Sequence, residues 1–212
     1  MTIPNLLTLA RLALTPVIAI LAYSTSAAVR TAALGLFLLA MATDVVDGVI
    51  AKRAGQASVL GLYLDPVTDK IILVTMFFLL ADFGLVPLWI ALLMMAREFL
   101  VDGLRQAGAV RGQVVGANVM GKTKAALQTG CIVLGLAVRA AQADAALWRP
   151  AVTAASGFTL LLAWLFAGVF LWQNRLLLKE ANDRQSASAQ LPPEDPPYGR
   201  PAENEAAASR RA

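Results

Sequence analysis

Four aspartates within 26 residues are the side chains of this sequence best suited to chemistry: Asp44, Asp47, Asp65 and Asp69. In an α-helix, residues three or four positions apart share a face, so each pair would present its two carboxylates together. Gly48 continues the first face without a side chain, which leaves room for a bulky ligand. Antiparallel neighbouring helices would bring both pairs to one depth, where four carboxylates repel one another unless cations neutralise them.

The ligand types available in the chain decide which cations these are. The sequence has no histidine and a single cysteine, Cys131, which excludes His-based acid–base catalysis, His-ligated metals and an internal disulfide. Carboxylate oxygens suit Mg²⁺, Mn²⁺ or Ca²⁺. Two divalent ions about 3.5–4 Å apart, bridged by carboxylates, are a recurring arrangement for displacement at phosphorus. The acidic cluster therefore predicts metal-assisted phosphoryl chemistry.

A second group of residues is basic and follows later in the chain. Arg97 lies within an apolar segment, where a charge is expensive and usually functional. Arg105 comes eight residues later, about two helical turns, and so lies on nearly the same face. Lys122 and Lys124 fall at the predicted start of a helix, where backbone N–H groups also favour phosphate. Four such cations predict a pocket for a ligand that carries a phosphate group.

Each of these residues also has a purely structural interpretation. Asp65 precedes Pro66, which is the form of a helix N-cap followed by a proline at the first helical position. Arg97 could pair with Glu98 or Asp102, and the two lysines could be ordinary positive charges flanking a span. Asp44 and Asp47 could be interfacial charges, or they could pair with Lys52 and Arg53. A cation transporter would also use an intramembrane acidic cluster, although no internal repeat accompanies this one.

The elements that must position these residues are apolar helices. The sequence is 58% hydrophobic and only 15% charged, which is too apolar for an ordinary soluble domain. It predicts an all-α, polytopic membrane protein with six transmembrane helices. The first segment contains Arg11 and Pro16, so its start is predicted to be an interfacial helix. The six segments are 6–24, 31–50, 66–83, 85–104, 124–142 and 151–174.

The distribution of Lys and Arg predicts the orientation in the membrane. Eight basic residues would share one side with both termini, against three on the other: Lys52, Arg53, Arg105, Arg111, Lys122, Lys124, Arg175 and Lys179, against Arg30, Arg139 and Arg149. Cytoplasmic loops carry such an excess, so the termini and the acidic cluster are predicted to face the cytoplasm. Residues 1–178 form the predicted membrane domain. Residues 179–212 are polar and Pro-rich, and are predicted to be a disordered cytoplasmic tail.

The acidic window resembles the CDP-alcohol phosphotransferases, which share the pattern D-x2-D-G-x2-A-R-x8-G-x3-D-x3-D. Seven positions match at the same spacings: Asp44, Asp47, Gly48, Ala51, Gly61, Asp65 and Asp69. The one departure is Lys52, where the family has Arg, with Arg53 immediately after. A lysine keeps the charge but loses the planar fork that binds phosphate in bidentate fashion, so either residue could take the Arg role.

The resemblance implies a fold, a cofactor and a division of roles. It implies a six-helix membrane protein, usually a homodimer, with two Mg²⁺ (or Mn²⁺) ions at a cytoplasmic site. The first three aspartates would hold the ions, and Asp69 would be both a ligand and the base that takes the acceptor hydroxyl proton. CDP-diacylglycerol would be bound by Gly48, Ala51, Lys52, Ser58 and Gly61.

Two further stretches narrow the acceptor. The sequences Ala-Arg-Glu at 96–98 with Gly-Leu-Arg at 103–105, and Gly-Lys-Thr-Lys at 121–124, resemble the matching segments of bacterial phosphatidylglycerophosphate synthases. The resemblance implies transfer of the phosphatidyl group of CDP-diacylglycerol to sn-glycerol 3-phosphate, with release of CMP. Inositol phosphate, or phosphatidylglycerol as in a cardiolipin synthase, is the alternative acceptor.

Overall fold

The structure is a computed structural model of the whole chain. It describes residues 3–54, 59–109 and 119–173, and within these ranges no side chain is described at 3–4, 44–54, 59–63, 65, 107–109 and 119. The chain divides into two units, Met1–Phe170 and Leu171–Ala212, and all packing described below lies within the first. The predicted tail, 179–212, lies outside the described residues.

The described residues form six α-helices, one for each predicted apolar segment, which confirms the all-α prediction for this part of the chain. The predicted ends differ from the observed ones most at the third helix, which begins at Val59 rather than at residue 66. The predicted start, Pro66, lies inside the observed helix. The helices are α1 (Ile3–Ala22), α2 (Ala27–Ala54), α3 (Val59–Asp82), α4 (Leu88–Ala109), α5 (Val119–Ala140) and α6 (Ala145–Gln173).

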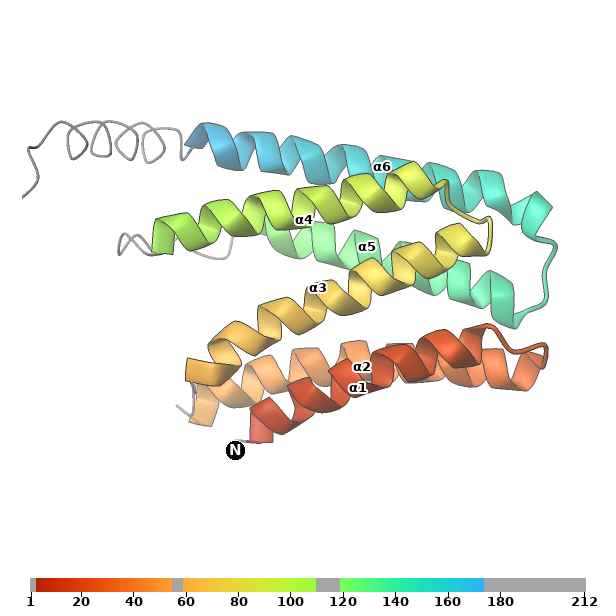
Figure 1. Ribbon diagram of the computed structural model, residues 1–212, viewed down its shortest axis with the longest axis horizontal. Coiled ribbons are helices and arrows are strands. Elements are labelled where there is room, and N and C mark those ends of the chain that lie inside the picture. Colours follow the sequence, from red (N-terminus) through yellow and green to blue (C-terminus); the bar gives the residue numbers. More distant parts are fainter. Residues whose placement is uncertain (1–2, 55–58, 110–118, 174–212) are drawn as a thin grey trace, which may run out of the picture. The chain divides into compact units, whose positions relative to one another are not determined.

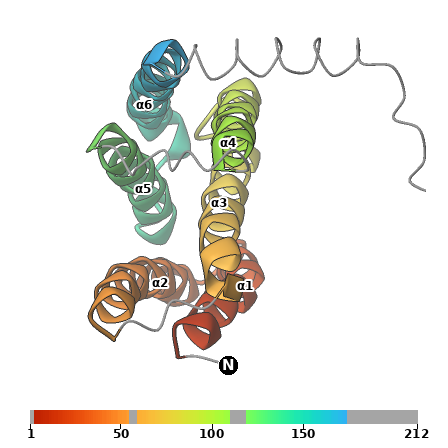
Figure 2. The ribbon, with the colours of Figure 1, turned by 90° about the vertical axis from the view of Figure 1, so that its left-hand side faces the viewer.

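Successive helices of the first unit run in opposite directions (Figure 1). As a result, the end of α2, the start of α3, the end of α4 and the start of α5 lie at the same end of the unit. Helix α1 packs against α2 and α3, α5 also packs against α2 and α3, and α3 packs against α4 (Figures 1 and 2). The topology thus gathers the predicted acidic and basic segments at one end of the helices.

An apolar core holds the helices in this register. Gly135 on α5 lets Leu80 of α3 lie directly against the helix backbone, because a Cβ at this glycine would be only 2.4 Å from Leu80 Cδ2. At the other end of α3, Gly84 takes a positive φ of 68° and turns the chain toward α4. Each helix contributes at least one side chain that is no more than 2% exposed: Ile18, Phe37, Met76, Met94, Ile132 and Val152.

Helix α6 joins this core through polar contacts as well as apolar ones. The Thr153 hydroxyl donates to the Leu85 carbonyl at 3.0 Å, beside the start of α4. Further along, the Thr159 hydroxyl and the Cys131 thiol of α5 are 3.3 Å apart. Such contacts fix the rotation of α6, because each polar atom finds its partner in only one orientation.

Within the residues that the structure describes, two helices, α1 over Asn5–Ala22 and α6, are long and apolar enough to cross a membrane by length and composition. The apolar part of α2, Ala27–Thr43, is shorter. In α3, α4 and α5, charged residues shorten the apolar stretch. Six membrane-spanning helices therefore stay a prediction. The predicted interfacial start belongs to α1, which contains Pro16 within a single helix.

Candidate active site

The four aspartates of the acidic window lie on two helix ends. Asp44 and Asp47 belong to the last part of α2, and Asp65 and Asp69 to the first part of α3. These ends lie at the same end of the first unit (Figure 1). The side chains of the first three are outside the described part of the structure, whereas that of Asp69 is described.

The N-cap interpretation of Asp65 is wrong. Helix α3 begins at Val59, so Asp65 lies inside the helix, and Pro66 is an internal proline rather than the first helical residue. Because the helix starts before both residues, neither of them caps it. As an internal residue, Pro66 instead removes a backbone donor and costs helix stability.

Asp69 is held by a residue from the N-terminal helix. Arg11 of α1 donates from Nη1 to Asp69 Oδ1 at 2.9 Å. The Arg11 side chain is only 3% exposed, whereas that of Asp69 is 42% exposed. The guanidinium thus approaches from inside the helix bundle, and the carboxylate reaches outward from it.

Asp69 lines a cavity of about 360 Å³ between α3, α4 and α5. The four basic residues singled out in the sequence line the same cavity: Arg97, Arg105, Lys122 and Lys124. The first two come from α4 and the other two from the start of α5. The structure thus brings the aspartate at the end of the acidic motif together with all four predicted cations.

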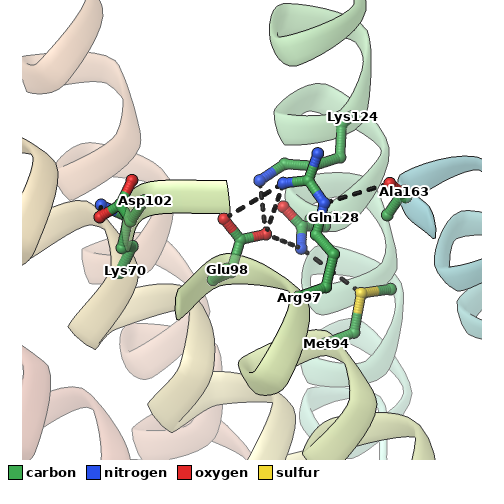
Figure 3. Close-up of polar contacts among 8 residues, drawn as sticks. All are labelled: Lys70, Met94, Arg97, Glu98, Asp102, Lys124, Gln128 and Ala163. Atoms are coloured by element: carbon green, nitrogen blue, oxygen red, sulfur yellow. Dashed lines mark hydrogen bonds and ion pairs between the residues drawn. The ribbon is translucent and has the colours of Figure 1, made fainter. Parts of the chain in front are cut away.

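A buried carboxylate organises two of these cations (Figure 3). Glu98 is 5% exposed, and its Oε1 accepts from Lys124 Nζ at 2.5 Å, from Gln128 Nε2 at 3.2 Å and from Arg97 Nη1 at 3.4 Å. Arg97 also donates from Nε to the Ala163 carbonyl of α6 at 3.1 Å. The structural interpretation of Arg97 as a partner of Glu98 is therefore confirmed, and Lys124 shares the same partner.

A second ion pair crosses from α3 to α4. Lys70, which follows Asp69, pairs with Asp102, and both line the cavity. Figure 3 shows this pair apart from the contacts around Glu98. The pair ties the two helices together beside the cavity and neutralises one of its cations.

The cavity lining nevertheless carries an excess of positive charge. Five basic and three acidic residues line it, which leaves a formal charge of +2. Three of the basic residues are held by Glu98 and Asp102. The other two, Arg105 and Lys122, are exposed, and neither has an ion pair within the residues that the structure describes. The lining is thus suited to an anion that enters from outside.

Four of the five residues predicted to contact the CDP group lie at the same end of the helices. Gly48, Ala51 and Lys52 belong to α2, and Gly61 belongs to α3. Side-chain placement at these positions is outside the described part of the structure, as is the whole of Ser58.

Sequence reasoning missed the residues that hold the site rather than form it. Arg11 was interpreted only through its effect on the first helix, yet it pairs with Asp69, 58 residues away. Gln128 and Lys70 were not singled out at all. The available signal was the charge itself: Arg11 and Lys70 are ionised residues in apolar helices, where each needs a partner.

Comparison with known proteins assigns the chain to a family. The family model for CDP-alcohol phosphatidyltransferase matches residues 1–166. The chain is similar to proteins named CDP-diacylglycerol–glycerol-3-phosphate 3-phosphatidyltransferase. One, from Bacillus subtilis, is 35% identical over 134 residues (58% of this chain, 69% of the relative). Another, from Rickettsia bellii, is 39% identical over 129 residues (59% and 70%).

A Mycobacterium tuberculosis protein named "Probable phosphatidylglycerophosphate synthase" is 34% identical over 137 residues, which cover 63% of this chain and 64% of that protein. The matched region of the family model includes the whole acidic motif and both basic segments. This chain therefore belongs to the CDP-alcohol phosphatidyltransferase family.

Proposed function

We propose that this enzyme transfers the phosphatidyl group of CDP-diacylglycerol to sn-glycerol 3-phosphate, giving phosphatidylglycerol phosphate and CMP. The observation that carries this proposal is the cavity that Asp69 shares with Arg97, Arg105, Lys122 and Lys124. An acceptor with its own phosphate needs cations beside the catalytic carboxylate, and this cavity supplies them. The names of the Bacillus subtilis and Rickettsia bellii relatives support the same acceptor.

In the proposed reaction, Asp69 accepts the proton of the acceptor's primary hydroxyl as its oxygen attacks the β-phosphorus. The new oxygen–phosphorus bond forms while the bond from that phosphorus to the oxygen bridging to CMP breaks, and CMP leaves with the electron pair. Arg105 and Lys122 bind the acceptor phosphate, together with the N–H groups of Arg97 and Lys124 that neither Glu98 nor the Ala163 carbonyl engages. The hydroxyl is thereby held next to the carboxylate.

The donor set fits a divalent metal ion, which the family generally uses. Asp44, Asp47, Asp65 and Asp69 are oxygen donors on two helix ends at the same end of the unit, and hard cations prefer such ligands. Two Mg²⁺ or Mn²⁺ ions bound there would polarise the pyrophosphate and stabilise the leaving CMP. Arg11 holds Asp69 from the bundle interior.

The CDP group of the donor lipid is proposed to lie against the end of α2. Gly48 and Ala51 offer a nearly bare face, and Gly61 and Ser58 complete the motif across the connection to α3. Lys52 or Arg53 would contact the pyrophosphate, the lysine as a point charge and the arginine through its planar fork.

We place the enzyme in the cytoplasmic membrane, with six spans and the site and both termini facing the cytoplasm. Large apolar side chains exposed on α4 and α6 support burial in lipid: Trp89, Leu92, Phe99, Phe158, Leu161 and Leu165. Residues 1–178 would form the membrane domain, with an interfacial start and a disordered tail at 179–212. A homodimer is the expected assembly.

The test is CMP release by detergent-purified protein supplied with CDP-diacylglycerol and Mg²⁺. Glycerol 3-phosphate, inositol phosphate, phosphatidylglycerol and no acceptor are compared, each with and without EDTA. We expect release only with glycerol 3-phosphate, and none with EDTA. Release with inositol phosphate or phosphatidylglycerol instead would keep the transferase and overturn the acceptor. Family membership already favours a transferase over a cation transporter.

Replacing either exposed cation of the cavity is expected to weaken acceptor binding. Arg105→Ala and Lys122→Ala should each raise the KM for glycerol 3-phosphate about tenfold, which corresponds to one charge-assisted hydrogen bond. The KM for CDP-diacylglycerol should stay unchanged. Arg149→Ala, at an exposed arginine near the start of α6, is the matched control. Equal acceptor KM values in all three variants would contradict the prediction.

Replacing Arg11 is expected to slow turnover without weakening acceptor binding. Arg11→Gln removes the cation that holds Asp69, so kcat should fall about 10- to 100-fold, the equivalent of one hydrogen bond to a charged group. The KM for glycerol 3-phosphate should change little. Arg30 of α2 is also a buried arginine, so Arg30→Gln controls for the loss of a buried positive charge. A kcat as high as that of this control would argue against a role for Arg11.

A further inference from the structure

Glu98 places a negative charge in the cavity, where the phosphate of the acceptor would be expected to meet only cations. It lines the cavity, yet only 5% of the residue is exposed to solvent. Its hydrogen-bond partners come from α4 and α5. A buried ion pair contributes little net stability compared with apolar residues of similar volume, because both charges must be desolvated. Stability alone is therefore a weak reason for this arrangement.

The geometry leaves donors available on both cations. Lys124 has three ammonium hydrogens, and its bond to Glu98 uses one of them. Arg97 has five N–H groups: Nε–H donates to the Ala163 carbonyl, and Nη1 donates to Glu98. Both side chains are thus held by Glu98 (Figure 3), and both also line the cavity.

The anchoring restricts two flexible side chains. Lys and Arg lose rotamer freedom when they are fixed, so a ligand that has to fix them binds more weakly. Glu98 fixes both before the ligand arrives, and Gln128, 1% exposed, orients the same carboxylate oxygen through its amide. A phosphate entering the cavity would then meet preorganised donors.

We infer that Glu98 is a positioning residue for the acceptor phosphate, building on the glycerol 3-phosphate site proposed above. Its carboxylate holds Lys124 and Arg97 in the orientation in which their remaining N–H groups face the bound phosphate. The acid thus increases affinity for an anion, although its own charge opposes the anion.

The direction in which phosphate affinity changes when Glu98 is neutralised separates positioning from simple electrostatics. If only the net charge of the cavity mattered, Glu98→Gln would strengthen phosphate binding, since it removes a negative charge. If Glu98 positions the cations, the same change weakens binding. Asp102→Asn is the matched control, because it also neutralises an acid of the cavity, but one whose partner is Lys70. Glu98→Asp keeps the charge and withdraws the carboxylate by one methylene.

The experiment measures kcat and both KM values for the wild-type protein and these three variants. We expect Glu98→Gln to raise the KM for glycerol 3-phosphate about tenfold, and Glu98→Asp to raise it in the same direction. The KM for CDP-diacylglycerol should be unchanged, and Asp102→Asn should not raise the acceptor KM. Calorimetric titration with inorganic phosphate should show the same order of affinities without turnover.

The results that would overturn the inference are distinct from those that would overturn the function. An acceptor KM in Glu98→Gln equal to or below that of the wild type, or a loss confined to kcat and thermal stability, would remove the positioning role. Should Glu98→Gln fail to fold, Glu98→Asp decides by the same criterion. Failure of the proposed function would instead appear in the wild-type protein, as CMP release that does not depend on glycerol 3-phosphate. The phosphate titration would still test Glu98 in that case.

Discussion

Asp69→Asn is expected to lower the rate of CMP release by about 10²–10⁴-fold, the usual contribution of a positioned general base. The amide has nearly the same shape as the carboxylate, but it cannot accept the hydroxyl proton, and it is a poor ligand for a divalent cation. The bond from Arg11 can still be made to the amide oxygen, so the position of the side chain should be preserved. The variant should therefore fold and still bind CDP-diacylglycerol.

Asp82→Asn is the matched control for this substitution. Asp82 lies at the opposite end of the same helix, where it accepts a hydrogen bond from the Tyr23 hydroxyl at 2.6 Å. Its replacement makes the same chemical change away from the cavity, so CMP release should continue at close to the wild-type rate. If Asp69→Asn retained a rate similar to that of this control, Asp69 would not be the base.

The acidic motif and the helices could be predicted from the sequence because both are local patterns. The spacing of Asp65 and Asp69 fixes a shared face on any helix, and six apolar segments are long enough to identify six helices. The start of α3 could not be predicted in the same way. Pro66 is a local signal for a helix start, yet the helix begins at Val59 and contains this proline.

The partners of the charged residues could not be predicted, because they come from distant segments. The sequence offered Glu98 and Asp102 as alternative partners for Arg97, all on one helix. Glu98 is the observed partner, whereas Asp102 pairs with Lys70 of another helix. Spacing along one helix gives the neighbours on that helix but not the neighbours across a helix interface, which depend on helix rotation and register.

The same interface leads to the largest expected effect on stability. Lys124→Met keeps the length of the side chain but removes the ammonium group from Glu98, whose side chain is only 6% exposed. Breaking a buried ion pair by removing one partner costs about 3–5 kcal/mol, because the remaining charge stays desolvated. Arg97 still contacts Glu98, at 3.4 Å, so we expect a loss near 3 kcal/mol, at the lower end of this range. Unfolding in detergent micelles measures it.

Lys122→Met and a double variant separate the buried charge from other consequences of losing a lysine. Lys122 lies two residues earlier on α5 and is exposed, so its replacement should change the free energy of unfolding by less than about 0.5 kcal/mol. Glu98→Gln combined with Lys124→Met should recover part of the lost stability, because the neutral amide no longer needs a cation and can still accept from Gln128 and Arg97, while Arg97 loses its carboxylate partner. A loss in Lys124→Met no larger than that in Lys122→Met would mean that water reaches Glu98. The carboxylate would then not need its cations for stability, and its proposed hold on Lys124 would be correspondingly weak.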